Sequence, residues 1–94
     1  MMKYAIKYTN KMKKSAKLMQ KRGKDMSKLA FVIDELAQGR ELDEKYCDHQ
    51  LKGKLKDFRE CHIEPDWLLV YRIRDNELEL FLFRTGTHSD LFNK

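Results

Sequence analysis

The chain has 94 residues, of which 41% are hydrophobic, 37% charged and 11% aromatic, and its net charge is +5. We expect one domain over residues 1–94, because this length and apolar content suit a single packed core and exclude a disordered protein. The longest apolar runs, 67–71 and 80–83, are far shorter than the about 18 residues of a membrane span. Since no apolar signal segment follows Met1, we predict a soluble, cytoplasmic protein with no membrane partner.

Charge is distributed unevenly along the chain. Residues 1–30 contain ten Lys or Arg and one acid, whereas residues 31–94 contain ten Lys or Arg and fourteen acids. A basic segment of this density indicates a polyanionic partner, either nucleic acid or an acidic protein segment. A solvated, lysine-rich helix is the alternative. Two cysteines, Cys47 and Cys61, allow at most one disulfide, and we interpret them as buried thiols.

The first elements in chain order are a strand and a helix. Residues 3–8 are rich in strand formers. Thr9 or Asn10 can cap a helix that runs to about Arg22, and Gly23 can end it. Three lysines spaced four apart form a stripe roughly opposite the apolar face of this helix: Lys13, Lys17 and Lys21.

A second helix gives the strongest periodic signal. It can begin at Asp25 or Ser27 and end at Gly39, with apolar residues at i, i+3, i+4, i+7 and i+8: Leu29, Val32, Ile33, Leu36 and Ala37. The following stretch, 40–56, is polar and aperiodic, so we expect a long irregular connection there. Loops of this length in a small domain are usually functional or disordered.

The C-terminal third predicts three strands, over 58–63, 67–74 and 77–84, joined by a turn at Pro65 and a tight hairpin at 75–76. Both faces of 67–74 are apolar, which indicates a central strand. The order β-α-α-β-β-β predicts an α+β fold with both helices on one face of an antiparallel sheet. The other face would then be open for binding.

Residues with catalytic chemistry concentrate in the acidic half. In a three-stranded meander the end of the second strand lies beside the start of the third, so the residues around these points can converge. The candidates are three histidines, a carboxylate, an indole and a guanidinium: His49, His62, His88, Asp66, Trp67 and Arg84.

This set suits metal-independent RNA cleavage. Imidazoles can act as base and acid near neutral pH. Arg84 can stabilise charge on the phosphate, and Trp67 or Phe92 can stack on a base. The structural alternatives are surface histidines, a core Trp67 and an Arg84 paired with an acid. Strict alternation also places Arg84 with the apolar side of its strand unless a bulge intervenes. No ligand spacing indicates a metal or cofactor.

Three segments of the C-terminal half carry a family resemblance. Residues 49–53 (HQLKG), 58–71 (FRECHIEPDWLLVY) and 84–92 (RTGTHSDLF) closely resemble the YafQ-type branch of the RelE/ParE toxin superfamily. The predicted β-α-α-β-β-β order and the chain length match the fold of that superfamily.

The resemblance implies a toxin of a bacterial type II toxin–antitoxin pair, an endoribonuclease that enters the ribosomal A site and cuts mRNA without a metal. It implies three partners: a cognate antitoxin with an acidic wrapping segment, mRNA on the ribosome, and 16S ribosomal RNA. The lysine stripe would dock on ribosomal RNA or on the antitoxin. The active-site set of the family falls on His49, His62, His88, Asp66, Trp67, Arg84 and Phe92.

Two other functions remain open at this stage. The first alternative is a ParE-like toxin that binds and inhibits DNA gyrase without catalysis, because one fold can serve both activities. The second is a plain RNA- or ribosome-binding domain. Three imidazoles beside an arginine favour the nuclease, since a binding module does not require them.

Overall fold

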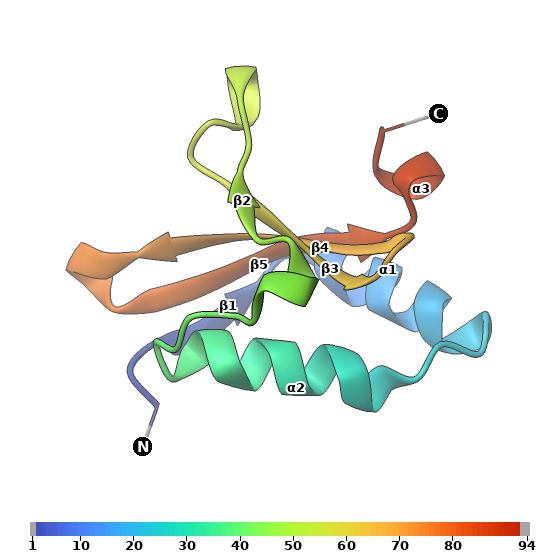
Figure 1. The fold of residues 1–94 in the computed structure, drawn as a ribbon, viewed down its shortest axis with the longest axis horizontal. Helices are drawn as coiled ribbons and strands as arrows, with labels where there is room; N and C mark the ends of the chain where they lie inside the picture. Colours follow the sequence, from blue (N-terminus) through green and yellow to red (C-terminus); the bar gives the residue numbers. More distant parts are fainter. Residues whose placement is uncertain (1, 93–94) are drawn as a thin grey trace.

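The computed structural model describes residues 2–92, which form a five-stranded sheet with helices on both sides (Figure 1). The strands lie in the order β1-β5-β4-β3-β2 and span Ala5–Tyr8 (β1), His49–Gln50 (β2), Arg59–Glu64 (β3), Trp67–Arg74 (β4) and Glu79–Gly86 (β5). The helices span Asn10–Lys21 (α1), Met26–Ala37 (α2) and His88–Phe92 (α3). Three short 3-10 turns span Glu44–Tyr46 (η1), Gly53–Leu55 (η2) and Asp75–Glu77 (η3).

The two long helices begin and end as the sequence predicts. The Thr9 hydroxyl accepts a hydrogen bond of 2.9 Å from the backbone N–H of Met12, which caps α1. Asp25 caps α2 in the same way, through the N–H of Ser27 at 3.0 Å. Gly23 follows α1 with φ +83°. This left-handed conformation favours glycine and stops the helix.

The sheet differs from the predicted antiparallel one because it is mixed. Strands β3, β4 and β5 pair antiparallel, but β1 pairs parallel to β5, with Ala5 opposite Glu79. The two helices that follow β1 carry the chain across the sheet, and this crossover permits the parallel pairing. The expected irregular stretch 40–56 contains the short strand β2, and η3 replaces the expected two-residue hairpin. There Leu78, with φ +52°, takes the left-handed position instead of Asp75 or Asn76.

A β-bulge changes the face on which the end of β5 lies. Tyr71 of β4 is opposite Leu82 and Val70 is opposite Arg84, so Phe83 is an extra residue in β5. Leu82 therefore faces the long helices, whereas Arg84 lies on the opposite face with Val70. Strict alternation would have placed Arg84 beside Leu82, and the bulge reverses that placement.

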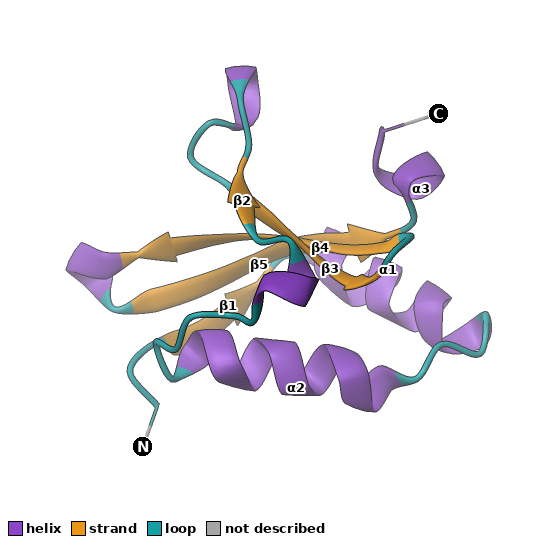
Figure 2. Cartoon of the chain, viewed as in Figure 1, coloured by secondary structure: helices purple, strands orange, loops and turns teal. Residues whose placement is uncertain are grey.

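Apolar side chains pack on both faces of the sheet. The main core lies between the long helices and the sheet, and β4 contributes Trp67, Leu69 and Tyr71 to it. A second cluster lies on the opposite face, which we call the site face, and contains Leu68, Val70, Leu91, Leu51, Phe58 and Phe83. The predicted central position of β4 is thus confirmed. Figure 2 shows α3 and the β2–η2 segment rising from the site face, so this face is only partly open.

The cysteine prediction is half right. Cys61 is buried in the main core, where burial raises the pKa of its thiol. Cys47 is exposed, because it sits in a loop after η1 with a left-handed φ of +48°. None of the helices within residues 2–92 is long and apolar enough to span a membrane.

Candidate active site

Three histidines from three different elements lie in a row on the site face. His49 of β2 and His62 of β3 have ring centroids 6.4 Å apart, and His62 and the ring of His88 in α3 are 5.8 Å apart. The row follows from strand pairing, because His49 lies opposite Glu60 and His62 lies opposite Leu68. The structure thus brings together the three imidazoles that the sequence singled out.

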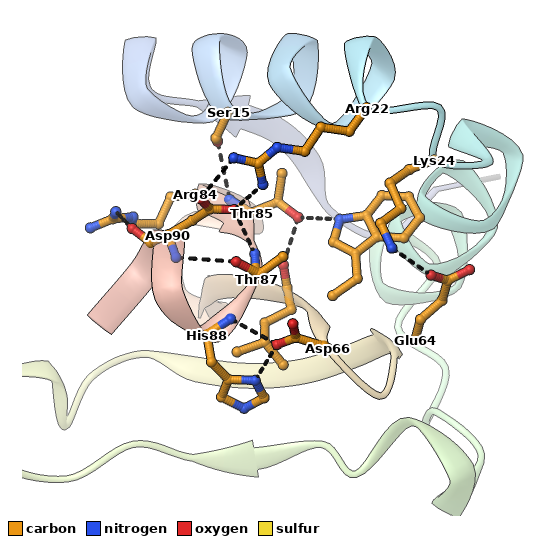
Figure 3. Close-up of polar contacts among 12 residues, drawn as sticks. Ser15, Arg22, Lys24, Glu64, Asp66, Arg84, Thr85, Thr87, His88 and Asp90 are labelled. Carbon is orange, nitrogen blue, oxygen red and sulfur yellow. Dashed lines mark hydrogen bonds and ion pairs between the residues drawn. The ribbon is translucent and has the colours of Figure 1, made fainter. Parts of the chain in front are cut away.

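Asp66 fixes the last ring of the row. Its Oδ1 lies 2.6 Å from His88 Nδ1 and accepts a hydrogen bond of 3.0 Å from the His88 backbone N–H (Figure 3). This backbone bond, followed by the bond to the imidazole, holds the pKa of the Asp66 carboxyl below its usual range. An ionised Asp66 places a proton on Nδ1 of His88, so Nε2 is the nitrogen left for proton transfer.

Sequence reasoning missed a buried carboxylate beneath the row. Glu60 is only 6% exposed, and its Oε1 lies 3.6 Å from His49 Nε2 and 3.7 Å from His62 Nε2. A signal was present, since Glu60 lies two residues before His62 and therefore on the same face of the strand. The pairing of β2 with β3, which brings His49 to Glu60, could not be found from local pattern.

Backbone carbonyls orient the other two rings toward Glu60. Nδ1 of His49 lies 2.8 Å from the carbonyl of Cys47, and Nδ1 of His62 lies 3.2 Å from that of Pro65. Because a carbonyl only accepts, each Nδ1 carries the proton and each Nε2 turns toward the carboxylate. The Glu60 carboxylate therefore lies within ion-pair distance of both rings when they are protonated.

Arg84 lies where β5 meets α3. It is partly buried, and its guanidinium donates a hydrogen bond of 3.0 Å to the carbonyl of Asp90. The Asp90 carboxylate is paired at 2.6 Å with Arg22, the residue that follows α1, and accepts a bond of 2.9 Å from the Thr87 N–H. These partners, Arg22 first, lower the pKa of Asp90 to about 2, so the α1–α3 link is charged at neutral pH.

The structure places Trp67, for which a stacking role was predicted, away from the site face. Its side chain is 0% exposed and lies in the main core, on the face of β4 that contacts the long helices. The indole N–H donates to the Thr85 hydroxyl at 3.0 Å, and that hydroxyl donates to the Leu68 carbonyl at 2.6 Å. Phe92, at the end of α3 and 37% exposed, is the aromatic ring that stays accessible.

The predicted lysine stripe is exposed but does not reach the cavity beside Arg84. Met12 and Met19 anchor α1 in the core, and Lys13, Lys17 and Lys21 lie on its outer side. The ammonium of Lys13 lies 5.3 Å from the ring centroid of Tyr8. The lysines that line the cavity beside Arg84 are instead Lys11 and Lys14. Within residues 2–92 no three His, Cys, Asp or Glu side chains are grouped as metal ligands.

Two long helices on one face of a mixed sheet place the chain in the RelE-like fold class, with the histidine row on the other face of the sheet. A family model described as "Bacterial toxin of type II toxin-antitoxin system, YafQ" matches residues 4–93, and the chain belongs to this family.

Individual relatives agree with this assignment. The mRNA interferase toxin YafQ of Escherichia coli strain K12 is 43% identical over 88 residues, which are 93% of this chain and 94% of that protein. The E. coli DinJ–YafQ toxin–antitoxin complex matches with a TM-score of 0.88 and 42% identity, over 96% of this chain and 98% of the other. A metal-bound toxin from Helicobacter pylori has a TM-score of 0.89 and 49% identity, over 98% and 100%. The predicted family and enzyme class, an endoribonuclease toxin, are confirmed.

Proposed function

We propose that this chain cuts mRNA in the ribosomal A site by a metal-independent attack of a ribose 2′-OH on the adjacent phosphate, and so arrests translation and growth. One observation carries the proposal. The row of three imidazoles ends at His88, which Asp66 holds at 2.6 Å. Arg84, four residues earlier in the chain, supplies a cation beside the same helix.

The chemistry requires one proton to leave and one to arrive. A base takes the 2′-OH proton, the 2′ oxygen bonds to phosphorus, and the bond from phosphorus to the 5′ oxygen breaks. An acid then protonates that 5′ oxygen, which leaves a 2′,3′-cyclic phosphate and a 5′-hydroxyl. His88, His62, His49 and Asp66 share these two roles, each worth roughly 10²–10⁴-fold in rate. Arg84 stabilises the charge on the phosphate oxygens, and Phe92 positions the nucleotide.

The basic half of the chain supports two macromolecular partners. The outer lysines of α1, Lys13, Lys17 and Lys21, are exposed and can bind 16S ribosomal RNA phosphates or an acidic segment of a cognate antitoxin. The similar E. coli toxin is seen in complex with the antitoxin DinJ, which supports an antitoxin partner for this chain.

Mapping of mRNA ends by primer extension after induction tests the proposal. We expect discrete cuts inside translated codons, because the message reaches the site in the ribosome. We also expect toxin that has been treated with EDTA and then dialysed free of it to cut ribosome-bound mRNA at the same rate as untreated toxin, because the imidazoles and Arg84 supply every group the reaction needs. Uncut message with gyrase-linked DNA damage would support the gyrase inhibitor instead. Activity that is lost from the EDTA-treated toxin and restored when a metal is returned to it would contradict the metal-independent mechanism.

A second prediction concerns Glu60, whose replacement should lower activity without lowering stability. Replacing Glu60 with Gln keeps the side-chain shape but removes the charge that faces His49 and His62. We expect kcat to fall roughly ten- to hundredfold through misplaced imidazoles, with KM little changed. Stability should stay equal or rise, because a buried carboxylate costs solvation energy. Single-turnover kinetics and urea unfolding measure both effects.

Glu60→Asp is the matched control, since it restores the charge one methylene away. It should recover part of the rate that Glu60→Gln loses. A Glu60→Gln protein that cleaves at the wild-type rate would show that the carboxylate has only a structural role.

A further inference from the structure

A cationic cleft lies between α1 and α3, beside the end of β5. Its volume is about 360 Å³, and its walls carry Lys11, Lys14 and Arg84 together with the apolar side chains of Leu18 and Leu91. Among the described residues that line it, the sole acid is Asp90, which Arg22 already neutralises at 2.6 Å. The cleft therefore presents positive charge next to a small apolar surface.

Hydrogen bonds to β5 fix the orientation of α1 along this cleft. Just before the helix, the Thr9 N–H donates to the Leu82 carbonyl at 3.2 Å and the Thr9 hydroxyl donates to the Phe83 carbonyl at 2.6 Å. Inside the helix, Ser15 accepts a bond of 3.1 Å from the Thr85 N–H. Figure 3 shows Ser15 of α1 pointing toward the end of β5, and Arg22, which follows the helix, pointing toward α3. The side of α1 with Lys11, Lys14 and Leu18 is thereby held against the cleft.

The cleft and the candidate active site share two elements, Arg84 and helix α3. Arg84 lines the cleft, and its bond to the Asp90 carbonyl uses one of the five donors of the guanidinium. Helix α3 begins with His88, whose ring closes the histidine row, and contributes Leu91 to the cleft wall. A strand of RNA that reaches His88 can therefore continue past Arg84 toward α1.

We propose that this cleft holds the phosphate backbone of the substrate RNA strand on one side of the cleaved bond, with Lys11, Lys14 and Arg84 as its phosphate ligands. Phosphate oxygens are the strongest acceptors that such cations meet on RNA, and Leu18 and Leu91 give a ribose or base an apolar contact. The inference rests on the proposed function and specifies how that site holds its substrate. Under this proposal Lys11 and Lys14 bind the mRNA, whereas Lys13, Lys17 and Lys21 on the outer side of the same helix bind ribosomal RNA or the antitoxin.

Three double variants on one helix test this assignment. Single-turnover cleavage is measured on ribosomes programmed with a defined mRNA, over a range of toxin concentrations. For Lys11→Ala with Lys14→Ala, we expect the rate at saturating toxin to fall about tenfold or more, because substrate positioning is lost. For Lys13→Ala with Lys17→Ala, we expect an unchanged saturating rate and a higher half-saturating concentration. Lys11→Arg with Lys14→Arg should keep most of the rate.

The outcomes separate failure of this inference from failure of the proposed function. If wild-type toxin cuts and the Lys11/Lys14 variant cuts equally fast at saturation, the inference is wrong and the nuclease function stands. If the Lys11/Lys14 variant changes only the half-saturating concentration, these lysines bind ribosomal RNA phosphates, which also overturns the assignment. If wild-type toxin leaves the programmed mRNA uncut, the proposed function itself fails. All four lysines are exposed, so misfolding does not confuse the comparison.

Discussion

Replacing His88 with alanine should lower the rate of mRNA cleavage by roughly 10²–10⁴-fold, the range lost with a general acid or base. The ring of His88 is the only imidazole of the row within the described residues that a carboxylate holds at direct hydrogen-bond distance, 2.6 Å from Asp66. The variant should stop inhibiting growth when it is induced. Primer extension on ribosome-bound message and growth curves measure the two effects.

The fold should survive this change. The His88 side chain is 49% exposed, so its removal leaves no cavity in either apolar cluster. The backbone N–H of residue 88 can still donate to Asp66 after the substitution. Thermal unfolding of His88→Ala should therefore match that of the wild type. A folded His88→Ala protein with full toxicity would refute the proposed mechanism.

Replacing Trp67 with alanine should act on stability instead, at a cost of about 3–5 kcal/mol of unfolding free energy. The indole is 0% exposed and belongs to the main core, and its N–H is bonded to the buried Thr85. The substitution leaves a large cavity and removes a donor from that hydroxyl. Urea unfolding measures the change, and loss of activity should follow the loss of folded protein.

Trp67→Phe distinguishes packing from a contact with RNA. Phenylalanine keeps an aromatic ring in the core but cannot donate to Thr85, so stability should fall by about 1–3 kcal/mol. The fraction that remains folded should cleave within a fewfold of the wild-type rate. A well-folded Trp67→Phe protein with a large loss of kcat would show that the indole contacts the substrate after all.

Local signals were enough to predict the helices and the convergence of the histidines. The caps at Thr9 and Asp25 are fixed by residues two or three positions away, so a short window contains them. The meander of β3, β4 and β5 brings the ends of β3 and β5 to the same part of the sheet, and the start of α3 then places His88 beside His62. Asp66 follows, because it sits in the turn between β3 and β4.

The remaining features depend on pairings that no local period reveals. The parallel β1–β5 contact joins residues far apart in the chain. The β2–β3 contact is closer in sequence, but β2 has only two residues and therefore carries no alternation that would mark it as a strand. Unless the β2–β3 pairing is known, nothing distinguishes Glu60 from any other carboxylate on a strand. The location of Trp67 could not be predicted for a different reason. An aromatic ring at the start of a strand suits both a binding site and a core, and only the burial of the side chain in the structure decides between them.

The bulge at Phe83 adds one residue to β5 without being needed for the placement of the residues after it. If Phe83 were lost, Arg84 would follow Leu82 directly, and strict alternation would still place it opposite Val70 on the site face. Thr85 would likewise stay opposite Leu69, toward the long helices. A single codon deletion at this position would thus remove an aromatic side chain from the second cluster and leave the guanidinium in the site. Over evolutionary time, β5 can therefore lose one residue at this point and keep its arginine.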